Sequence, residues 1–462
     1  MRKGNVSLPI TVLTLFMIFV FSASLSAAEG VSGGRIADNI SEKVDEYLGA
    51  ATELDRFSGS VLIARGEEVI LKRGYGTADR EHDVANTPRV KFRLGSVTKQ
   101  FTAMGILQLY EAGKLKLTDP VTDYTSKYED SREITIFHLL THSSGLAEYT
   151  ASEGVGTRVK LPTTKKEIIE SFWNKELRFS PGEKFSYCNS NYVLLGHIIE
   201  KASGQSYENY IEKKIFSPLG MKDSGYDHPE IVLENRGEGY VNIGGEVLNA
   251  SYIDTSFPNA AGALYSTVGD LHNWYLALTS GKVVSQKLWE EATSAQVGNY
   301  GYGFMEGNLW GYRRIYHGGT VNGFKAMINI FPEPDLALIV LSNLETAEIE
   351  RLNRDLAAIV FGEDYELPQP EEFIELDEGV LKSYTGEYAA DNGYRVEASR
   401  QRDHLILSLM GQPKLEVFPL SETEFSPKGS GLVVEFNLDG NGGVSGMKVT
   451  QERRSLEAEK VG

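Results

Sequence analysis

The 462-residue sequence predicts an α+β domain followed by a small all-β domain. Strand-like apolar runs lie near both ends of the first 365 residues, and the stretch between them is largely helical. This order favours one antiparallel sheet flanked by helices, with an all-helical subdomain. After residue 378 the pattern changes to short alternating runs separated by turn residues, which indicates a small up-and-down β-barrel.

The elements of the first domain follow from their hydrophobic periods. An amphipathic helix is expected over residues 36–54, followed by a β-hairpin over 60–64 and 69–74. Residues 101–112 are apolar nearly all round, so we expect a helix buried on every side, ended by Gly113. The other elements expected here are helices at 134–142, over most of 163–216, after Thr267 and at 348–361, and strands at 312–317, 324–331 and 336–342.

An acidic segment with two prolines, residues 366–378, is expected to link the two domains. The predicted domains are therefore residues 29–365 and residues 379–462. The strands expected in the second domain are 394–398, 404–409, 415–418, 433–437 and 444–449.

Residues 1–28 predict a cleavable signal peptide. Arg2 and Lys3 precede an apolar stretch at 8–21, and small residues follow at 26–28. The apolar run is too short for a comfortable membrane span. We therefore expect a secreted or extracytoplasmic protein with no membrane insertion after signal removal, and an uncleaved anchor is the alternative.

The chain is acidic, with a net charge of −18 and a pI of about 5.0. This excess of negative charge argues against nucleic acid as a partner. Cys188 is the single cysteine, which excludes an intrachain disulfide. A homo-oligomer is compatible with the sequence.

The strongest chemical signal is Ser96-Val-Thr-Lys99, at the start of the buried helix. A spacing of three residues places the serine and the lysine on one face, a turn apart. A lysine in the first turn opposes the helix dipole, and the dipole and burial both lower the pKa of its amine. The uncharged amine can then take the hydroxyl proton, which makes Ser96 a candidate nucleophile.

A second motif, Tyr187-Cys-Asn189, supplies two more candidates. In an extended segment the tyrosine and the asparagine point the same way. A phenol held between cations can lose its proton well below its usual pKa and act as a base. The amide of Asn189 can hold the carbonyl of a substrate and Lys99 at once.

A third motif, His317-Gly-Gly319, is expected at the end of a strand. Gly318 and Gly319 let a substrate backbone lie directly along the strand edge. The N–H group of Thr320 can join that of Ser96 as an oxyanion hole.

In combination, the three motifs resemble those of the serine β-lactamase-related family, which includes class C β-lactamases, D-Ala-D-Ala carboxypeptidases, D-aminopeptidases and esterases. Supporting stretches lie at 138–145, 260–266 and 300–303, and the resemblance spans residues 57–361. It implies a β-lactamase/transpeptidase-like fold and an acyl-enzyme on Ser96. It also implies that Lys99 and Tyr187 share the proton transfers and that Asn189 binds substrate. The trailing domain resembles the lipocalin-like extension of some members.

His317 departs from the Lys-Thr-Gly pattern of β-lactamases, as Tyr187 departs from Ser-Asp-Asn. The usual lysine is a permanent cation that can receive a substrate carboxylate, whereas a histidine is mostly neutral at pH 7. His317 can instead be the general base itself or hydrogen-bond the tyrosine. The cations that can replace the charge are Arg313, Arg314 and Lys325.

The expected function is an exported serine hydrolase, a peptidase or amidase acting on peptides that include D-amino acids. A β-lactamase or carboxylesterase of the same fold is the alternative, and a non-hydrolysing penicillin- or peptide-binding protein is another. The intact Ser96, Lys99 and Tyr187 argue against a binder, since a binder need not keep all three. No cofactor is expected.

No metal site is expected either. His138 and His142 are four residues apart, but no glutamate stands between them as in a zinc protease and no third ligand is evident. Structural roles at a helix end are favoured for both. Cys188 is expected to fill space beside the site.

Overall fold

The structure is a computed structural model that describes residues 39–125, 133–152, 154–390, 393–409, 414–429, 431–451 and 454–461. The predicted signal peptide lies outside these residues. None of the helices described is both long and apolar enough to cross a membrane.

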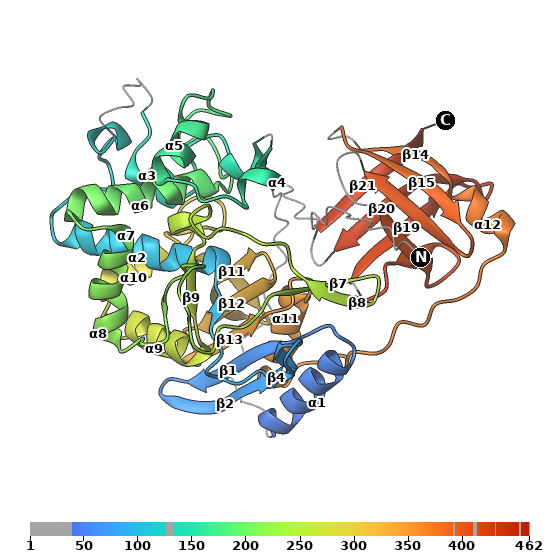
Figure 1. The fold of residues 1–462 in the computed structure, drawn as a ribbon, viewed down its shortest axis with the longest axis horizontal. Coiled ribbons are helices and arrows are strands. Elements are labelled where there is room, and N and C mark those ends of the chain that lie inside the picture. The colour runs from blue at the N-terminus through green and yellow to red at the C-terminus, as the bar shows by residue number, and fades with distance from the viewer. Residues whose placement is uncertain are drawn as a thin grey trace, which may run out of the picture.

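A six-stranded antiparallel sheet forms the centre of the first domain, in the order β10-β11-β12-β13-β1-β2 (Figure 1). Strand β1 from the start of the chain pairs with β13, so the two ends of the domain meet in one sheet, as predicted. The strands are β1 Gly59–Arg65, β2 Glu68–Tyr75, β10 Met305–Leu309, β11 Tyr312–Val321, β12 Phe324–Phe331 and β13 Leu336–Ser342.

Different helices cover the two faces of this sheet. Val61 and Ile63 of β1 belong to a core cluster shared with α1 (Ile40–Glu53) and α11 (Ile349–Phe361). The alternate residues Leu62 and Ala64 belong to a second core cluster, which contains residues of α2 (Thr98–Glu111) and α9 (Val268–Thr279). This alternation is the two-residue period of a strand, and it places the sheet between two helical layers.

Helix α2 (Thr98–Glu111) runs through the interior between the sheet and the helical subdomain (Figure 1). Every residue from 98 to 107 is buried, as the all-round apolar pattern predicted. Its neighbours in the subdomain include α6, which also contacts α3 and α5. The other helices of the domain are α3 Ile136–Leu140, α4 Val155–Arg158, α5 Lys165–Trp173, α6 Asn189–Ser203, α7 Tyr207–Ile211, α8 Ser217–Leu219, α9 Val268–Thr279 and α10 Gln286–Thr293.

The second domain is a closed barrel in which each strand from β14 to β21 pairs with the next and β21 pairs with β14. Its interior is filled by side chains that include Tyr388, Phe425 and Phe436. Helix α12 (Glu378–Ser383) precedes the first strand. The strands are β14 Gly386–Ala389, β15 Arg395–Gln401, β16 His404–Leu409, β17 Leu415–Pro419, β18 Glu424–Ser426, β19 Leu432–Leu438, β20 Val444–Gln451 and β21 Arg454–Val461.

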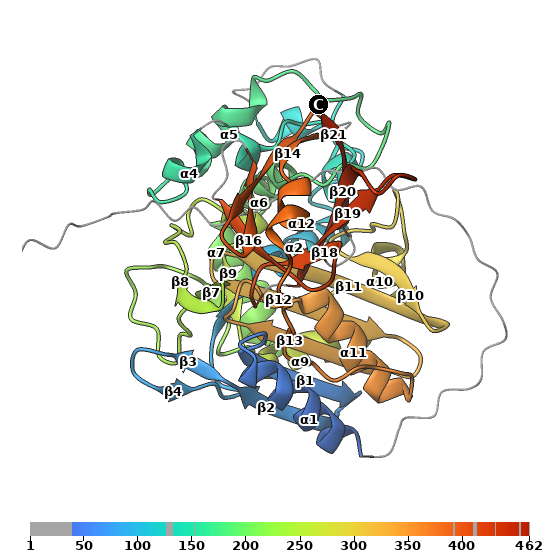
Figure 2. The same cartoon turned by 90° about the vertical axis from the view of Figure 1, so that its right-hand side faces the viewer.

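The segment that joins the domains contacts both of them. Its Glu371 pairs with Arg56 of the first domain at 3.2 Å and accepts a hydrogen bond from the backbone N–H of Gly429 of the barrel at 3.1 Å. Figure 2 shows the barrel in front of the first domain, with α12 facing the viewer. The boundaries given above for the two domains stay predictions.

The structure corrects the expected strands in two ways. Strand β11 continues through His317 and both glycines to Val321, so this motif lies within the strand and not at its end. The strand persists because Gly318 and Gly319 pair with Met327 and Ala326 of β12. In the central sheet and the barrel, strands β10, β14, β18 and β21 had no counterpart among the predicted strands, and neither had the short strands β3 to β9 outside them (residues 77–266).

Candidate active site

Ser96 lies in η1 (Gly95–Val97), a short 3-10 turn that leads into α2, and Lys99 is the second residue of α2. Gly95 has a left-handed backbone with φ +51°, which glycine adopts without strain. An added Cβ at Gly319 of β11 would lie 2.0 Å from the carbonyl oxygen of Leu94 and 2.8 Å from the backbone nitrogen of Ser96. Only glycine therefore lets the strand approach the serine so closely.

The amine of Lys99 has three polar partners, each 2.9 Å from Nζ. They are Oγ of Ser96, Oδ1 of Asn189 and the backbone oxygen of Ala261. The two carbonyl oxygens can only accept hydrogen bonds, so each takes one N–H of the amine. If the amine is uncharged, its lone pair is then left for the hydroxyl of Ser96.

Burial favours that uncharged form. Lys99 is fully buried, and the loss of solvation lowers the pKa of its amine to about 7. The negative charge of Glu148 opposes this effect and raises the pKa, more weakly than burial lowers it. The amine therefore changes charge near neutral pH, which is the range in which a general base is most useful.

Tyr187 completes the surroundings of the serine. Its side chain hydrogen-bonds to Ser96, and its ring centroid lies 4.9 Å from Nζ of Lys99. Burial raises the pKa of this phenol above its usual value. The sequence predicted that neighbouring cations lower the pKa of this phenol until it loses its proton. That prediction is wrong, because burial raises the pKa more than its neighbours lower it, and the hydroxyl keeps its proton at neutral pH.

Asn189 is the first residue of α6, so the expected extended segment ends at Cys188. Its side chain nevertheless reaches Lys99 through Oδ1. On its other side, Nδ2 donates to the carboxylate of Glu148 at 3.3 Å, and the backbone N–H of Asn189 donates to the same oxygen at 2.6 Å.

His317 lies beside this group but is turned into the interior. It is buried, its Nε2 lies 2.9 Å from the hydroxyl of Tyr300, and its Nδ1 lies 2.6 Å from the carbonyl oxygen of Gly318. Burial and the charge of Lys99 lower the pKa of His317 to about 3. The ring is therefore neutral, with Nδ1 donating to the carbonyl oxygen of Gly318 and Nε2 accepting from Tyr300. The tyrosine that His317 contacts by a hydrogen bond is thus Tyr300, whereas Tyr187 was expected.

In the described part of the chain, one edge of β11 is unpaired beside Ser96, over residues 317–321. Strand β10 pairs with β11 only as far as Tyr316, so residues 317–321 have no partner on that side among the strands described. Thr320 is exposed, and its backbone nitrogen lies 2.7 Å from the position of a Cβ added at Gly95. The structure thus brings the backbone of Thr320 next to the turn that carries Ser96, and Gly318 and Gly319 lie between it and His317.

Several residues of the site were missed by sequence reasoning. Glu148 accepts a hydrogen bond from Asn189, and the backbone oxygen of Ala261 accepts one from Lys99. The hydroxyl of Tyr300 hydrogen-bonds to His317. His142 lies among three aromatic rings, with ring centroids 4.3 Å from Tyr187, 5.0 Å from Tyr192 and 4.7 Å from Tyr300. All except Glu148 lie in stretches that supported the family resemblance, which was the available signal.

The residues set aside as structural have structural contacts. Nδ1 of His138 accepts the backbone N–H of Thr135 at the start of α3. Nδ1 of His142 accepts the backbone N–H of Cys188 at 3.0 Å. The thiol of Cys188 is buried, which raises its pKa to about 12 and keeps it protonated.

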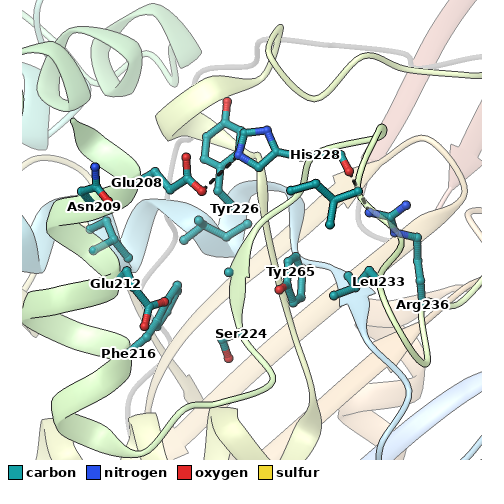
Figure 3. Close-up of a pocket in the computed structure, with 14 residues that line it drawn as sticks. Glu208, Asn209, Glu212, Phe216, Ser224, Tyr226, His228, Leu233, Arg236 and Tyr265 are labelled. Atoms are coloured by element: carbon teal, nitrogen blue, oxygen red, sulfur yellow. Dashed lines mark hydrogen bonds and ion pairs between the residues drawn. The ribbon is translucent and has the colours of Figure 1, made fainter.

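A separate pocket of about 200 Å³ lies between the helical subdomain and the short strands β6 (Gly225–Tyr226) and β9 (Leu264–Ser266) (Figure 3). Glu208 and His228 lie 3.1 Å apart at its rim. The residues that line it include none of those predicted for catalysis or substrate binding. This pocket is therefore separate from the candidate site around Ser96.

Comparison with known proteins places this site in a family. The Beta-lactamase family profile matches residues 36–361. Penicillin-binding protein 4* of Bacillus subtilis (strain 168) is 29% identical over 415 residues, covering 84% of this chain and 91% of that protein.

Two solved structures show the same fold. The octameric penicillin-binding protein homologue from Pyrococcus abyssi is 28% identical, with a TM-score of 0.64, covering 90% of this chain and 99% of that one. The D-stereospecific amidohydrolase from Streptomyces sp. is 25% identical, with a TM-score of 0.60, covering 69% and 98%. Because the profile matches most of the chain, this protein belongs to the serine β-lactamase-related family.

Proposed function

We propose that this chain is an exported serine hydrolase that forms an acyl-enzyme on Ser96 and cleaves amide bonds, in peptides that include D-amino acids. The observation that carries the proposal is the environment of Lys99. A buried amine with two carbonyl acceptors and a hydroxyl at 2.9 Å fits an uncharged base aimed at Ser96. The sequence of residues 1–28 supports export.

In the proposed reaction, Oγ of Ser96 attacks the substrate carbonyl carbon while its proton passes to Nζ of Lys99. The N–H groups of Ser96 and Thr320 stabilise the negative charge that develops on the carbonyl oxygen. The proton then reaches the leaving nitrogen through the hydroxyl of Tyr187, and the C–N bond breaks. Water hydrolyses the ester by the reverse proton path.

The neutral state of His317 favours an amide substrate without a free carboxylate over a carboxypeptidase substrate or a β-lactam, both of which carry one. Its neutral, doubly hydrogen-bonded ring offers no cation to a substrate carboxylate. The cations proposed to replace it are held elsewhere. Arg313 pairs with Glu306 at 2.6 Å, Nε of Arg314 donates to Asn329 at 2.6 Å, and Lys325 donates to the carbonyl oxygen of Ala347 at 2.8 Å.

The relatives support the same choice. One solved neighbour is named a D-stereospecific amidohydrolase, and its 25% identity extends over 69% of this chain. A homo-oligomer stays a prediction, which the octameric state of the Pyrococcus abyssi homologue supports.

Covalent labelling tests the proposal. A fluorophosphonate probe, read by intact mass, should add one group to the wild-type protein and none to the Ser96→Ala variant. Turnover should then be compared among a D-aminoacyl amide, a chromogenic cephalosporin and a short-chain ester, and the amide should show the highest kcat/KM. The absence of an adduct on the wild type, or equal labelling of the Ser96→Ala variant, would defeat the enzyme proposal and leave the binding protein.

A further inference from the structure

Glu148 is a buried carboxylate that accepts hydrogen bonds from Asn189 of the site and from Thr150 beside it. It is 8% exposed and follows the α3 helix, at the start of a short turn. Oε1 accepts from the backbone N–H of Thr150 at 3.0 Å and from its hydroxyl at 2.9 Å. Oε2 accepts from the backbone N–H of Asn189 at 2.6 Å and from its Nδ2 at 3.3 Å.

The contact with Nδ2 decides which way the amide of Asn189 points. A carboxylate accepts hydrogen bonds only, so the NH₂ group faces Glu148 and the oxygen faces Lys99. If the amide were reversed, its NH₂ group would face the amine of Lys99. It would then compete with the hydroxyl of Ser96 for the lone pair of that amine.

We propose that Glu148 is a positioning residue for this site, which holds the oxygen of Asn189 towards Lys99 and thereby aims the amine at Ser96. The inference rests on the proposed function, because it concerns the base of that reaction. Glu148 touches neither Ser96 nor Lys99 in any hydrogen bond of the described residues, so its effect passes through Asn189.

The charge of Glu148 gives the inference a second, separate signature. The groups that act electrostatically on Lys99 are Glu148 and Cys188, which raise its pKa, and the rings of Tyr187 and Tyr192 face its amine. Two neutral histidines also lie near it, His142 and His317. Glu148 is the carboxylate of this set, so its removal lowers the pKa of Lys99 further.

The Glu148→Gln variant tests the inference, because it keeps the size of the side chain and removes its charge. A glutamine has one acceptor oxygen, which cannot serve both Asn189 and Thr150. The amide of Asn189 should then lose its fixed direction, and we expect kcat to fall on the order of tenfold to a hundredfold, as for a misplaced catalytic group. The acid limb of the pH profile of kcat/KM should move to lower pH. A purely structural role would lower the active fraction, which labelling of Ser96 corrects for, and would leave this limb in place.

Two controls keep the outcomes apart. Glu345 is another buried carboxylate, which accepts from the backbone N–H of Gly323 at 2.7 Å, away from Ser96, and Glu345→Gln should leave the pH profile in place. In an Asn189→Ala background, Glu148→Gln should cost little further kcat, since its effect passes through the missing amide. An additive loss of kcat, or an unmoved acid limb in a protein that still labels at Ser96, would overturn the inference. A wild type that does not label would instead overturn the proposed function.

Discussion

The buried position of Lys99 is unfavourable for folding and favourable for its proposed role as a base. An amine without solvent loses the hydration that stabilises its charge, so the folded state prefers it uncharged. In the unfolded chain the same amine has its ordinary pKa near 10.5. The stability of the protein therefore rises with pH between these two pKa values, where the unfolded chain binds a proton that the folded chain has released.

This difference predicts a pH-dependent gain in stability for Lys99→Met. The folded pKa lies below the unfolded one, so the penalty on the wild type is complete below about pH 7 and disappears as the pH rises towards 10.5. The variant should exceed the wild type in free energy of unfolding most at pH 6 and least at pH 10, measured by urea denaturation. Lys222→Met, at an exposed position, is the matched control. A gain in free energy of unfolding that is the same at both pH values would contradict a buried amine with a lowered pKa at Lys99.

The residues that could be predicted are those whose roles depend on local spacing. Ser96 and Lys99 are three residues apart across the junction of η1 and α2, and this spacing brings their side chains together. Glu148 could not be found in this way, because its partner Asn189 is 41 residues away and meets it only in the folded chain. The state of Tyr187 was wrongly predicted because the sequence shows neighbouring charges but does not show how strongly the loss of solvation raises the pKa of its phenol.

Among the structural elements, the contact between η1 and β11 holds Ser96, the proposed nucleophile, against the strand. Two glycines face each other across it, Gly95 in the turn and Gly319 in the strand. A Cβ on the first would lie 2.7 Å from the backbone nitrogen of Thr320, and a Cβ on the second would meet the carbonyl oxygen of Leu94. The proposed oxyanion hole depends on this close approach.

A comparison of the Gly95→Ala and Gly113→Ala variants separates the effect of steric crowding from that of backbone strain. Both Gly95 (φ +51°) and Gly113 (φ +67°) are left-handed, but a Cβ on Gly113 meets nothing within 4 Å. Each alanine should cost about 1 kcal/mol of stability from its backbone conformation. Only Gly95→Ala should also lower kcat/KM, on the order of a hundredfold, because it displaces η1 from β11. Equal activity of the two variants would show that the turn does not depend on this contact.

Elements with a strong hydrophobic pattern were predicted well, and elements with a weak hydrophobic pattern were not. Helix α2 and strands β12 and β13 are mostly apolar and were expected close to where they lie. Strand β11 was cut short at His317 because two glycines disfavour a strand locally, whereas pairing with β12 maintains it. Strand β18 has three residues, too few for a period to be recognised.

The molecule as a whole has two parts (Figure 1). The first contains an open sheet in which strands from both ends of the first domain pair, and the second is a closed barrel beside it. The order of strand and helix patterns predicted both parts, since the pairing of β1 with β13 follows from strands at the two ends. The contact of the barrel with the first domain through Glu371 could not be predicted, because it depends on a loop at Gly429 that comes late in the chain.

The pH dependence of Ser96 acylation tests the central claim that an uncharged Lys99 is the base. The rate of labelling by a slow fluorophosphonate should be measured by intact mass from pH 5 to pH 10. The rate should rise with pH and level off, with a midpoint at about 7, because the amine becomes available as its proton leaves. The Lys99→Met variant should lack this rise. A midpoint near 10, or the same curve in that variant, would contradict the account.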